Sequence, residues 1–323
     1  MKGKGRGFFS LMGVRICSQL NWWTAGLLFL HAYHVGASEL TIEEIPLPAF
    51  RIDGQPARAH TQGLEVEGGK YFVTARREDV RPKRALLLRV TQTATNWEVW
   101  DITPRDSAGT AMNLDHPGGM QSDGRRLWIP IAESKPKSHS IIRVFSLAAM
   151  IPNQSLEPEF EFRVNDHIGA VAVAADRDLV FGANWDTESV YVWDLQGRLK
   201  RTLSGSEIKL RGLGAVGSSN DRGGVAIQDW KSVGTQIFAS GLSRDRTVAT
   251  TSSQSRLISI HNFLEPDFHQ SAIVLPLHKE TELAREAMAI SGGVALFLPE
   301  DLGVSNRIFR ISMTDLFKHS GAQ

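Results

Sequence analysis

The chain of 323 residues is 42% hydrophobic and 22% charged, a composition typical of a soluble globular protein. Its 36 basic and 35 acidic residues nearly balance, and there is no long basic run, so nucleic acid is not expected as a partner. Cys17 is the only cysteine, which excludes disulfides, cysteine-ligated zinc and a cysteine nucleophile from the rest of the chain.

The first 37 residues differ in kind from the rest of the chain. Four basic residues without an acid lead into the apolar stretch "WWTAGLLFLHAY", and "VGA" ends the segment with small residues. This layout predicts a signal peptide at 1–37, cleaved after Ala37. An uncleaved membrane anchor is the alternative, although the apolar run is shorter than the ~20 residues that a spanning helix needs. The predicted location is therefore secreted or periplasmic, with membrane contact only if the segment stays attached.

A near-repeat fills residues 38–323. Units open at His60, His116, His167, Ala226 and Ala284, so successive starts lie 56, 51, 59 and 58 residues apart. The openings align on a small residue at the fourth position, as in "HTQG", "HPGG" and "HIGA". Five units of this length predict a repeat architecture that forms one domain.

Within each unit the pattern has a period of two. The stretches "KYFVTA", "RLWIPIA", "DLVFGAN", "QIFASGL" and "VALFLPE" each follow a polar turn, and most precede another apolar strand. The expected fold is an all-β propeller with five blades, or six if 201–225 hide a degenerate blade; a pair of β-sandwiches is the alternative. "ELTIEEIPLPAF" at 39–50 is available as an outer strand that closes the ring onto the last blade. "KETELAREAM" at 279–288 is the best helix candidate.

The propeller fold predicts where the histidines that open the first three units lie. A blade begins with its innermost strand, so the starts of equivalent strands converge at one mouth of the central channel. Crowding of the inner strands there explains the small residue at the fourth position of each unit. In the fourth unit this position holds Asp229, and a buried carboxylate predicts a polar or metal-filled centre. Loops between second and third strands should reach the same mouth. We expect the site to contain His60, Gln62, His116, Glu133, His167, Asn184, Trp185, Asp229, Glu286 and Glu300.

Roles follow from residue type. The predicted catalytic residues are His116, His167 and Glu133, with His116 or His167 as the general base. Ligand contacts are expected from His60, Gln62, Trp185 and Glu286. One divalent cation is expected: Glu133, Asn184, Asp229 and Glu300 would suit calcium, whereas histidines would suit zinc. In the alternative interpretation the histidines are structural, and Asp115 and Asp166 fix His116 and His167.

Two resemblances rest on these motifs. "HTQGLEV", "HPGGMQSDGRRLWIPIAESKP", "DHIGAVAV", "GANWDTESVYVWD" and "QDWKSVG" resemble a family of secreted, propeller-like proteins of bacteria and fungi without an assigned function. "TQGLEV" is more remotely similar to plant-type glutaminyl cyclotransferases, five-bladed propellers whose F-T-Q-G-L motif places its glutamine in the substrate pocket. That resemblance implies a substrate role for Gln62. His60 replaces the phenylalanine of that motif, and Val73-Thr74-Ala75 replaces a run that bears an essential acid.

Three functions compete. The first is a hydrolase or lactonase-like enzyme, in which a cation at the mouth polarises a carbonyl and a histidine activates water. The second is a non-catalytic propeller that binds a small molecule or a partner protein at the same face. The third is cyclotransferase-like activity through Gln62. A monomer is expected in each case.

Overall fold

The computed structural model describes residues 40–214, 224–244 and 253–319. The predicted signal segment with Cys17 lies outside these residues, and so does the end of the glycine-rich stretch 212–217. Residues 38–323 form one compact unit.

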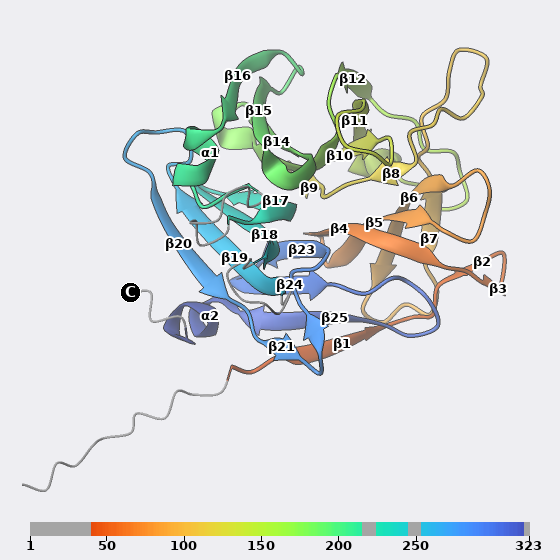
Figure 1. The fold of residues 1–323 in the computed structure, drawn as a ribbon. Coiled ribbons are helices and arrows are strands. Elements are labelled where there is room, and N and C mark those ends of the chain that lie inside the picture. The colour runs from red at the N-terminus through yellow and green to blue at the C-terminus, as the bar shows by residue number, and fades with distance from the viewer. Residues whose placement is uncertain (1–39, 215–223, 245–252, 320–323) are drawn as a thin grey trace, which may run out of the picture. The chain divides into compact units, whose positions relative to one another are not determined.

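Five antiparallel sheets follow one another along the chain (Figure 1). The first blade contains β4 (Ala59–Glu67), β5 (Lys70–Arg77), β6 (Arg84–Thr91) and β7 (Glu98–Asp101). The second contains β8 (His116–Pro117), β9 (Gln121–Ser122), β10 (Arg126–Ala132), β11 (Ser140–Ser146) and β12 (Phe160–Val164). The third contains β13 (Ile168–Ala174), β14 (Leu179–Asn184), β15 (Ser189–Asp194) and β16 (Leu199–Ser204).

The remaining blades complete the ring. The fourth contains β17 (Ala226–Val233), β18 (Gln236–Arg244), β19 (Ser253–His261) and β20 (His269–Val274). The fifth contains β23 (Ala287–Ser291), β24 (Val294–Leu298), β25 (Asn306–Ser312) and β1 (Glu43–Leu47). Outside the blades lie the hairpins β2 (Arg51–Ile52) with β3 (Gln55–Pro56) and β21 (Leu277–His278) with β22 (Thr281–Glu282), the 3-10 turns η1 (Leu147–Ala149), η2 (Ala175–Arg177) and η3 (Trp185–Thr187), and the short helices α1 (Ser206–Leu210) and α2 (Met313–His319).

The ring closes through its two chain ends. β1 pairs antiparallel with β25, with Ile45 opposite Ile308, so a strand from the start of the domain is the outer strand of the last blade. The predicted closure by 39–50 is confirmed, and so is the all-β propeller with five blades. Closure pairs an edge that would otherwise be free to recruit another strand.

One apolar cluster lies between each pair of neighbouring blades. Leu64 and Val73 of the first blade pack with Ala289 and Leu298 of the fifth, for example. Four further clusters join the first and second, second and third, third and fourth, and fourth and fifth blades. Strand residues that alternate toward and away from the neighbouring sheet supply these layers, which explains the period of two. Trp128, Trp193 and Trp230 lie in these clusters.

The helix prediction for 279–288 is wrong. Lys279 and Glu280 adopt positive φ angles in the turn of the β21–β22 hairpin, which a helix does not allow. Leu283 and Ala284 are buried in the cluster between the fourth and fifth blades, and this tertiary burial overrides the helix propensity of the stretch. Across the described residues, no helix is both long enough and apolar enough to cross a membrane.

Candidate functional site

Bulges in the inner strands aim side chains at one mouth of the channel. The β4–β5 register shifts between Thr61 and Gly63, so Gln62 lies outside the ladder. The same shift occurs in the third blade around Gly169 and in the fourth around Gln228, while in the second blade the inner strand is interrupted after Pro117. A bulge bends its strand and turns a side chain out of the pleat. The repeated irregularity thus defines the mouth.

His60 links two carboxyl groups at this mouth. Its Nδ1 donates a hydrogen bond to Oδ1 of Asp301 at 2.6 Å, and its Nε2 lies 3.9 Å from Oε1 of Glu286. Asp301 comes from the loop after β24, and Glu286 directly precedes β23, so the fifth blade supplies both carboxyl groups to the first blade's histidine. The Glu286 side chain is only 10% exposed, whereas that of Asp301 is 48% exposed.

These environments move the three pKa values in different directions. The hydrogen bond to Asp301 raises the pKa of His60 above 6.5, and the same bond lowers the pKa of Asp301. Burial raises the pKa of Glu286 from 4.5 to about 7, against the opposing effect of His60. Glu286 therefore titrates close to neutral pH beside a histidine whose pKa is raised, an arrangement that suits an acid–base pair.

Gln62 is held by the histidine of the second blade. Nη1 of Arg76 donates to Nδ1 of His116 at 3.0 Å, and because a guanidinium cannot accept, this nitrogen carries the lone pair. The proton then sits on Nε2, which donates to Oε1 of Gln62 at 3.0 Å. The same Nη1 donates to Ser134, whose hydroxyl donates to Asp115. The amide NH₂ of Gln62 has no hydrogen-bond partner among the residues that the structure describes.

His116 is thus a positioning residue. Both of its ring nitrogens are engaged, and burial together with the Arg76 charge lowers its pKa far below the ordinary value. A neutral ring with no free lone pair does not suit the predicted general base. Asp115, expected as its direct partner, acts through Ser134 instead.

His167, at the start of the third blade, contacts His116 of the second blade. Its Nδ1 donates to the carbonyl of Lys135 at 3.0 Å, and burial lowers its pKa, so the ring is neutral. Its ring packs edge-on to Trp185, with centroids 4.6 Å apart, and to His116 at 5.4 Å. Asp166 accepts from the backbone N–H of His167 rather than from its ring.

The turn that carries Trp185 is strained. Asp186 and Thr187 both have positive φ angles, 58° and 55°, and this conformation is costly for a β-branched residue. Thr187 is fully buried, and its hydroxyl accepts a hydrogen bond from the N–H of Ile227 in the fourth blade. Strain of this kind persists where the surrounding structure fixes the backbone, and it gathers at functional sites.

Asp229 fills the channel centre below this mouth. It is fully buried, and its carboxylate accepts from the N–H groups of Leu64 in the first blade and Met288 in the fifth. Lys231 donates to the same carboxylate at 2.5 Å and to the carbonyl of Met120 in the second blade at 2.7 Å. The predicted polar centre is therefore present, with an ammonium group as the cation that balances Asp229. Burial raises the pKa of Asp229 to about 6, and Lys231 opposes the rise.

Two more polar residues, which sequence reasoning missed, complete the centre. Glu65 accepts from the N–H groups of Val66 and Ser122, and burial raises its pKa to about 7. Gln121 accepts from the N–H groups of Val173 in the third blade and Ser232 in the fourth. Asp229, Lys231, Glu65 and Gln121, which we call the central plug, link all five blades. Glu65, Gln121 and Lys231 lie two positions after the small-residue position, a signal that the alternation of strand side chains could have supplied.

The four predicted oxygen ligands each have a local partner in the structure. Glu300 pairs with Arg307 at 2.9 Å, and Glu133 pairs with Lys135 at 2.8 Å. Asn184 donates to Asp166, and Asp229 pairs with Lys231. Each of the four side chains thus contacts a different neighbour, and their role as metal ligands stays a prediction. No group of three or more metal-ligating side chains is present in the described part of the chain. The cation itself stays a prediction.

Glu133 makes no hydrogen bond or ion pair with His60 or Glu286 among the interactions of the described residues. Its side chain lines a cavity of about 420 Å³ in the second blade, together with Leu114, His139, Ile141 and Arg163. The loop that follows Glu133 reaches the mouth through the Ser134 hydroxyl, which contacts Arg76 and Asp115, and through the Lys135 carbonyl, which accepts from His167. The described mouth residues are therefore His60, Gln62, Arg76, His116, Asp115, Ser134, His167, Trp185, Glu286 and Asp301.

Fold and site together define a five-bladed β-propeller with a polar, titratable mouth above a plugged channel. The chain belongs to a family of unknown function (DUF6454), whose model matches residues 52–277. No curated protein matches it. The catalytic domain of the Coprinopsis cinerea GH62 α-L-arabinofuranosidase is similar in fold, with 9% identity over 85% of this chain and 98% of that one, at a TM-score of 0.50. A glycosyl hydrolase from Bacteroides ovatus covers 79% of this chain and 84% of its own at 10% identity, with a TM-score of 0.43.

Proposed function

We propose that this propeller is a hydrolase that cleaves a small ester or lactone at the mouth. The observation that carries the proposal is the position of His60 between Asp301 and Glu286. Asp301 orients the imidazole through Nδ1 and leaves Nε2 to act as a base, as a third group does in catalytic triads.

Each mouth group has a task in this reaction. Nε2 of His60 takes a proton from water as its oxygen attacks the substrate carbonyl carbon. The NH₂ group of Gln62 donates to the carbonyl oxygen, where negative charge develops. Glu286 gives its proton to the leaving alkoxide as the C–O bond breaks, and a proton passed from His60 to Glu286 restores the starting state. Their separation of 3.9 Å suits this return, directly or through one water.

A hydrolysis screen tests the proposal. The probes are aryl esters, lactones of five and six ring atoms, and a peptide with an N-terminal glutamine, which covers the cyclotransferase resemblance. Glu286→Gln and His60→Gln should each lower kcat by about 10²-fold or more. Glu161→Gln is the matched control, because Glu161 lies on the outer strand β12 and pairs with Arg143.

The possible outcomes separate the competing functions. Ester or lactone turnover that both mouth variants abolish supports the hydrolase. Tight binding without turnover, lost in the same variants, would assign the non-catalytic binding propeller instead. Turnover that survives Glu286→Gln would overturn the role of Glu286 as the acid. Location outside the cytoplasm and a monomeric state stay predictions.

A further inference from the structure

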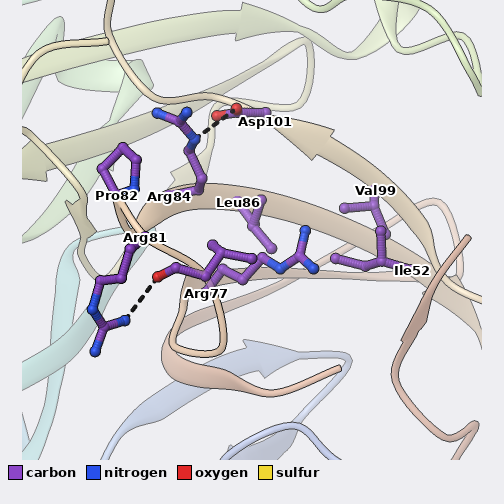
Figure 2. Close-up of a pocket in the computed structure, with 9 residues that line it drawn as sticks. Ile52, Arg77, Arg81, Pro82, Arg84, Leu86, Val99 and Asp101 are labelled. Atoms are coloured by element: carbon purple, nitrogen blue, oxygen red, sulfur yellow. Dashed lines mark hydrogen bonds and ion pairs between the residues drawn. The ribbon is translucent and has the colours of Figure 1, made fainter. Parts of the chain in front are cut away.

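A second cavity, of about 350 Å³, lies in the first blade (Figure 2). It is lined by Ile52, Arg77, Val80, Arg81, Pro82, Arg84, Leu86, Val99 and Asp101. Three arginines and one aspartate give this lining a formal charge of +2 (three minus one). We propose that this cavity binds an organic oxyanion, a carboxylate or phosphate ester, through Arg77 and Arg84, with its apolar part against Leu86 and Val99.

The arginines face one another because of strand register. Arg77 at the end of β5 pairs directly with Arg84 at the start of β6, so both side chains lie on one face of the sheet. Like charges directly opposite each other destabilise a sheet unless an anion lies between them. Asp79 offsets Arg77 through a 2.9 Å contact, and Arg84 has no comparably close acidic partner among the described residues.

Arg84 has unused hydrogen-bonding capacity. Its Nη1 is buried and has no hydrogen-bond partner within the described ranges. Its Nε lies 3.8 Å from Oδ2 of Asp101, beyond hydrogen-bond length. A buried donor without an acceptor costs free energy, and a planar oxyanion is the acceptor that a guanidinium fork fits best.

The other walls suit the rest of a ligand. Leu86 is buried, and Val99 and Ile52 are half-buried, so they offer apolar surface beside the charged groups. Arg81 fixes the rim, since its Nη1 donates to the carbonyls of Glu78 and Val80. A pocket with apolar walls and a few convergent polar groups is the usual form of a small-molecule site.

The test uses the full chain and four anions at constant ionic strength. Calorimetric titrations with benzoate, phenyl phosphate, acetate and inorganic phosphate should show that at least one aromatic anion binds more tightly than its small counterpart. Benzyl alcohol, the neutral control, should not bind. The stronger of benzoate and phenyl phosphate identifies the head group.

Variants assign the binding to this cavity. Arg84→Gln should raise the Kd of the aromatic anion by about tenfold or more, the loss expected for a charge-assisted hydrogen bond. Asp101→Asn should lower the Kd of the aromatic anion, because it removes a carboxylate that competes with the anion for Arg84. This change is opposite in direction to that of Arg84→Gln, so a misfolded Arg84→Gln variant would not produce it. Arg310→Gln, an exposed arginine that pairs with Glu43 on the fifth blade, is the control.

Failure has three forms. No binding of any aromatic anion, equal binding of benzyl alcohol, or a Kd unchanged in both Arg84→Gln and Asp101→Asn would overturn the proposal.

Discussion

At the scale of single residues, burial and pairing decide which side chains are available for chemistry. His116 uses both ring nitrogens to hold Gln62 and to accept from Arg76. His60 needs only one nitrogen for Asp301, and the buried Glu286 lies beside it at 3.9 Å, beyond direct hydrogen-bond length. The same residue type therefore has both ring nitrogens hydrogen-bonded in one blade and only one in another.

Glu286 should also make stability depend on pH. Its folded pKa of about 7 lies above the ordinary value of 4.5, so the folded state binds the proton more tightly. That stabilisation is complete below pH 4.5 and is lost as pH rises to about 7. The free energy of unfolding in urea should therefore fall less steeply with rising pH in Glu286→Gln than in the wild type across this pH range. Equal slopes for both proteins would contradict the raised pKa.

The Asp229–Lys231 pair gives a second prediction at this scale. Asp229→Asn leaves a fully buried ammonium group without its anion, which should cost about 3–5 kcal/mol in the free energy of unfolding. The double variant Asp229→Asn with Lys231→Met should recover part of that loss, because no charge remains buried. A single variant within about 1 kcal/mol of wild type in urea unfolding would show that the pair contributes little.

At the scale of elements, the inner strands approach too closely for side chains at some positions. A Cβ added to Gly118 would lie 2.0 Å from the carbonyl oxygen of Gly169, and one added to Gly119 would lie 2.6 Å from Oδ1 of Asp229. A Cβ at Gly169 would meet only the Ala183 carbonyl, at 3.9 Å. Gly119 holds the fourth position of its repeat, and a Cβ at Gly63, the same position in the first blade, would lie 2.8 Å from the carbonyl oxygen of Gly118. At these two positions the small residue is a packing requirement of the channel, as the repeat predicted.

These glycines make a matched pair of variants. Gly118→Ala should destabilise the protein by about 1–3 kcal/mol or more, since backbone must move to admit the methyl group. Gly169→Ala should be close to neutral in the same thermal unfolding measurement. Similar losses in both variants would mean that the second and third blades do not meet as closely as described.

The sequence predicted the positions of strands better than the contacts between side chains. Periodicity located the second strand of every blade and the third strand of four of them, and repeat alignment placed His60, Gln62 and Glu286 at one mouth. Asp301 was missed as the partner of His60 because the two are 241 residues apart and meet only when the ring closes. The local partners of the predicted metal ligands were missed for a related reason, since a contact such as that of Glu300 with Arg307 does not show in the periodicity of the strands.

At the scale of the whole molecule, three devices hold the ring together: the apolar clusters between blades, the central plug and the pairing of β1 with β25. Ile45 on β1 belongs to the cluster between the first and fifth blades and is 4% exposed, so closure also buries apolar surface. Ile45→Ala should cost about 2–5 kcal/mol in urea unfolding. Glu43→Ala, on the exposed side of the same strand, should cost less than about 1 kcal/mol, and equal costs would contradict this role for closure.

The most direct test of the acid–base mouth is a carbon-13 and nitrogen-15 NMR titration of Glu286 and His60 in the wild type and in Asp301→Asn. We predict a pKa of about 7 for Glu286 and one above 6.5 for His60, with the His60 value falling when Asp301 loses its charge. A Glu286 carboxyl that titrates at its ordinary 4.5, together with a His60 at or below 6.5, would contradict an acid–base pair at this mouth.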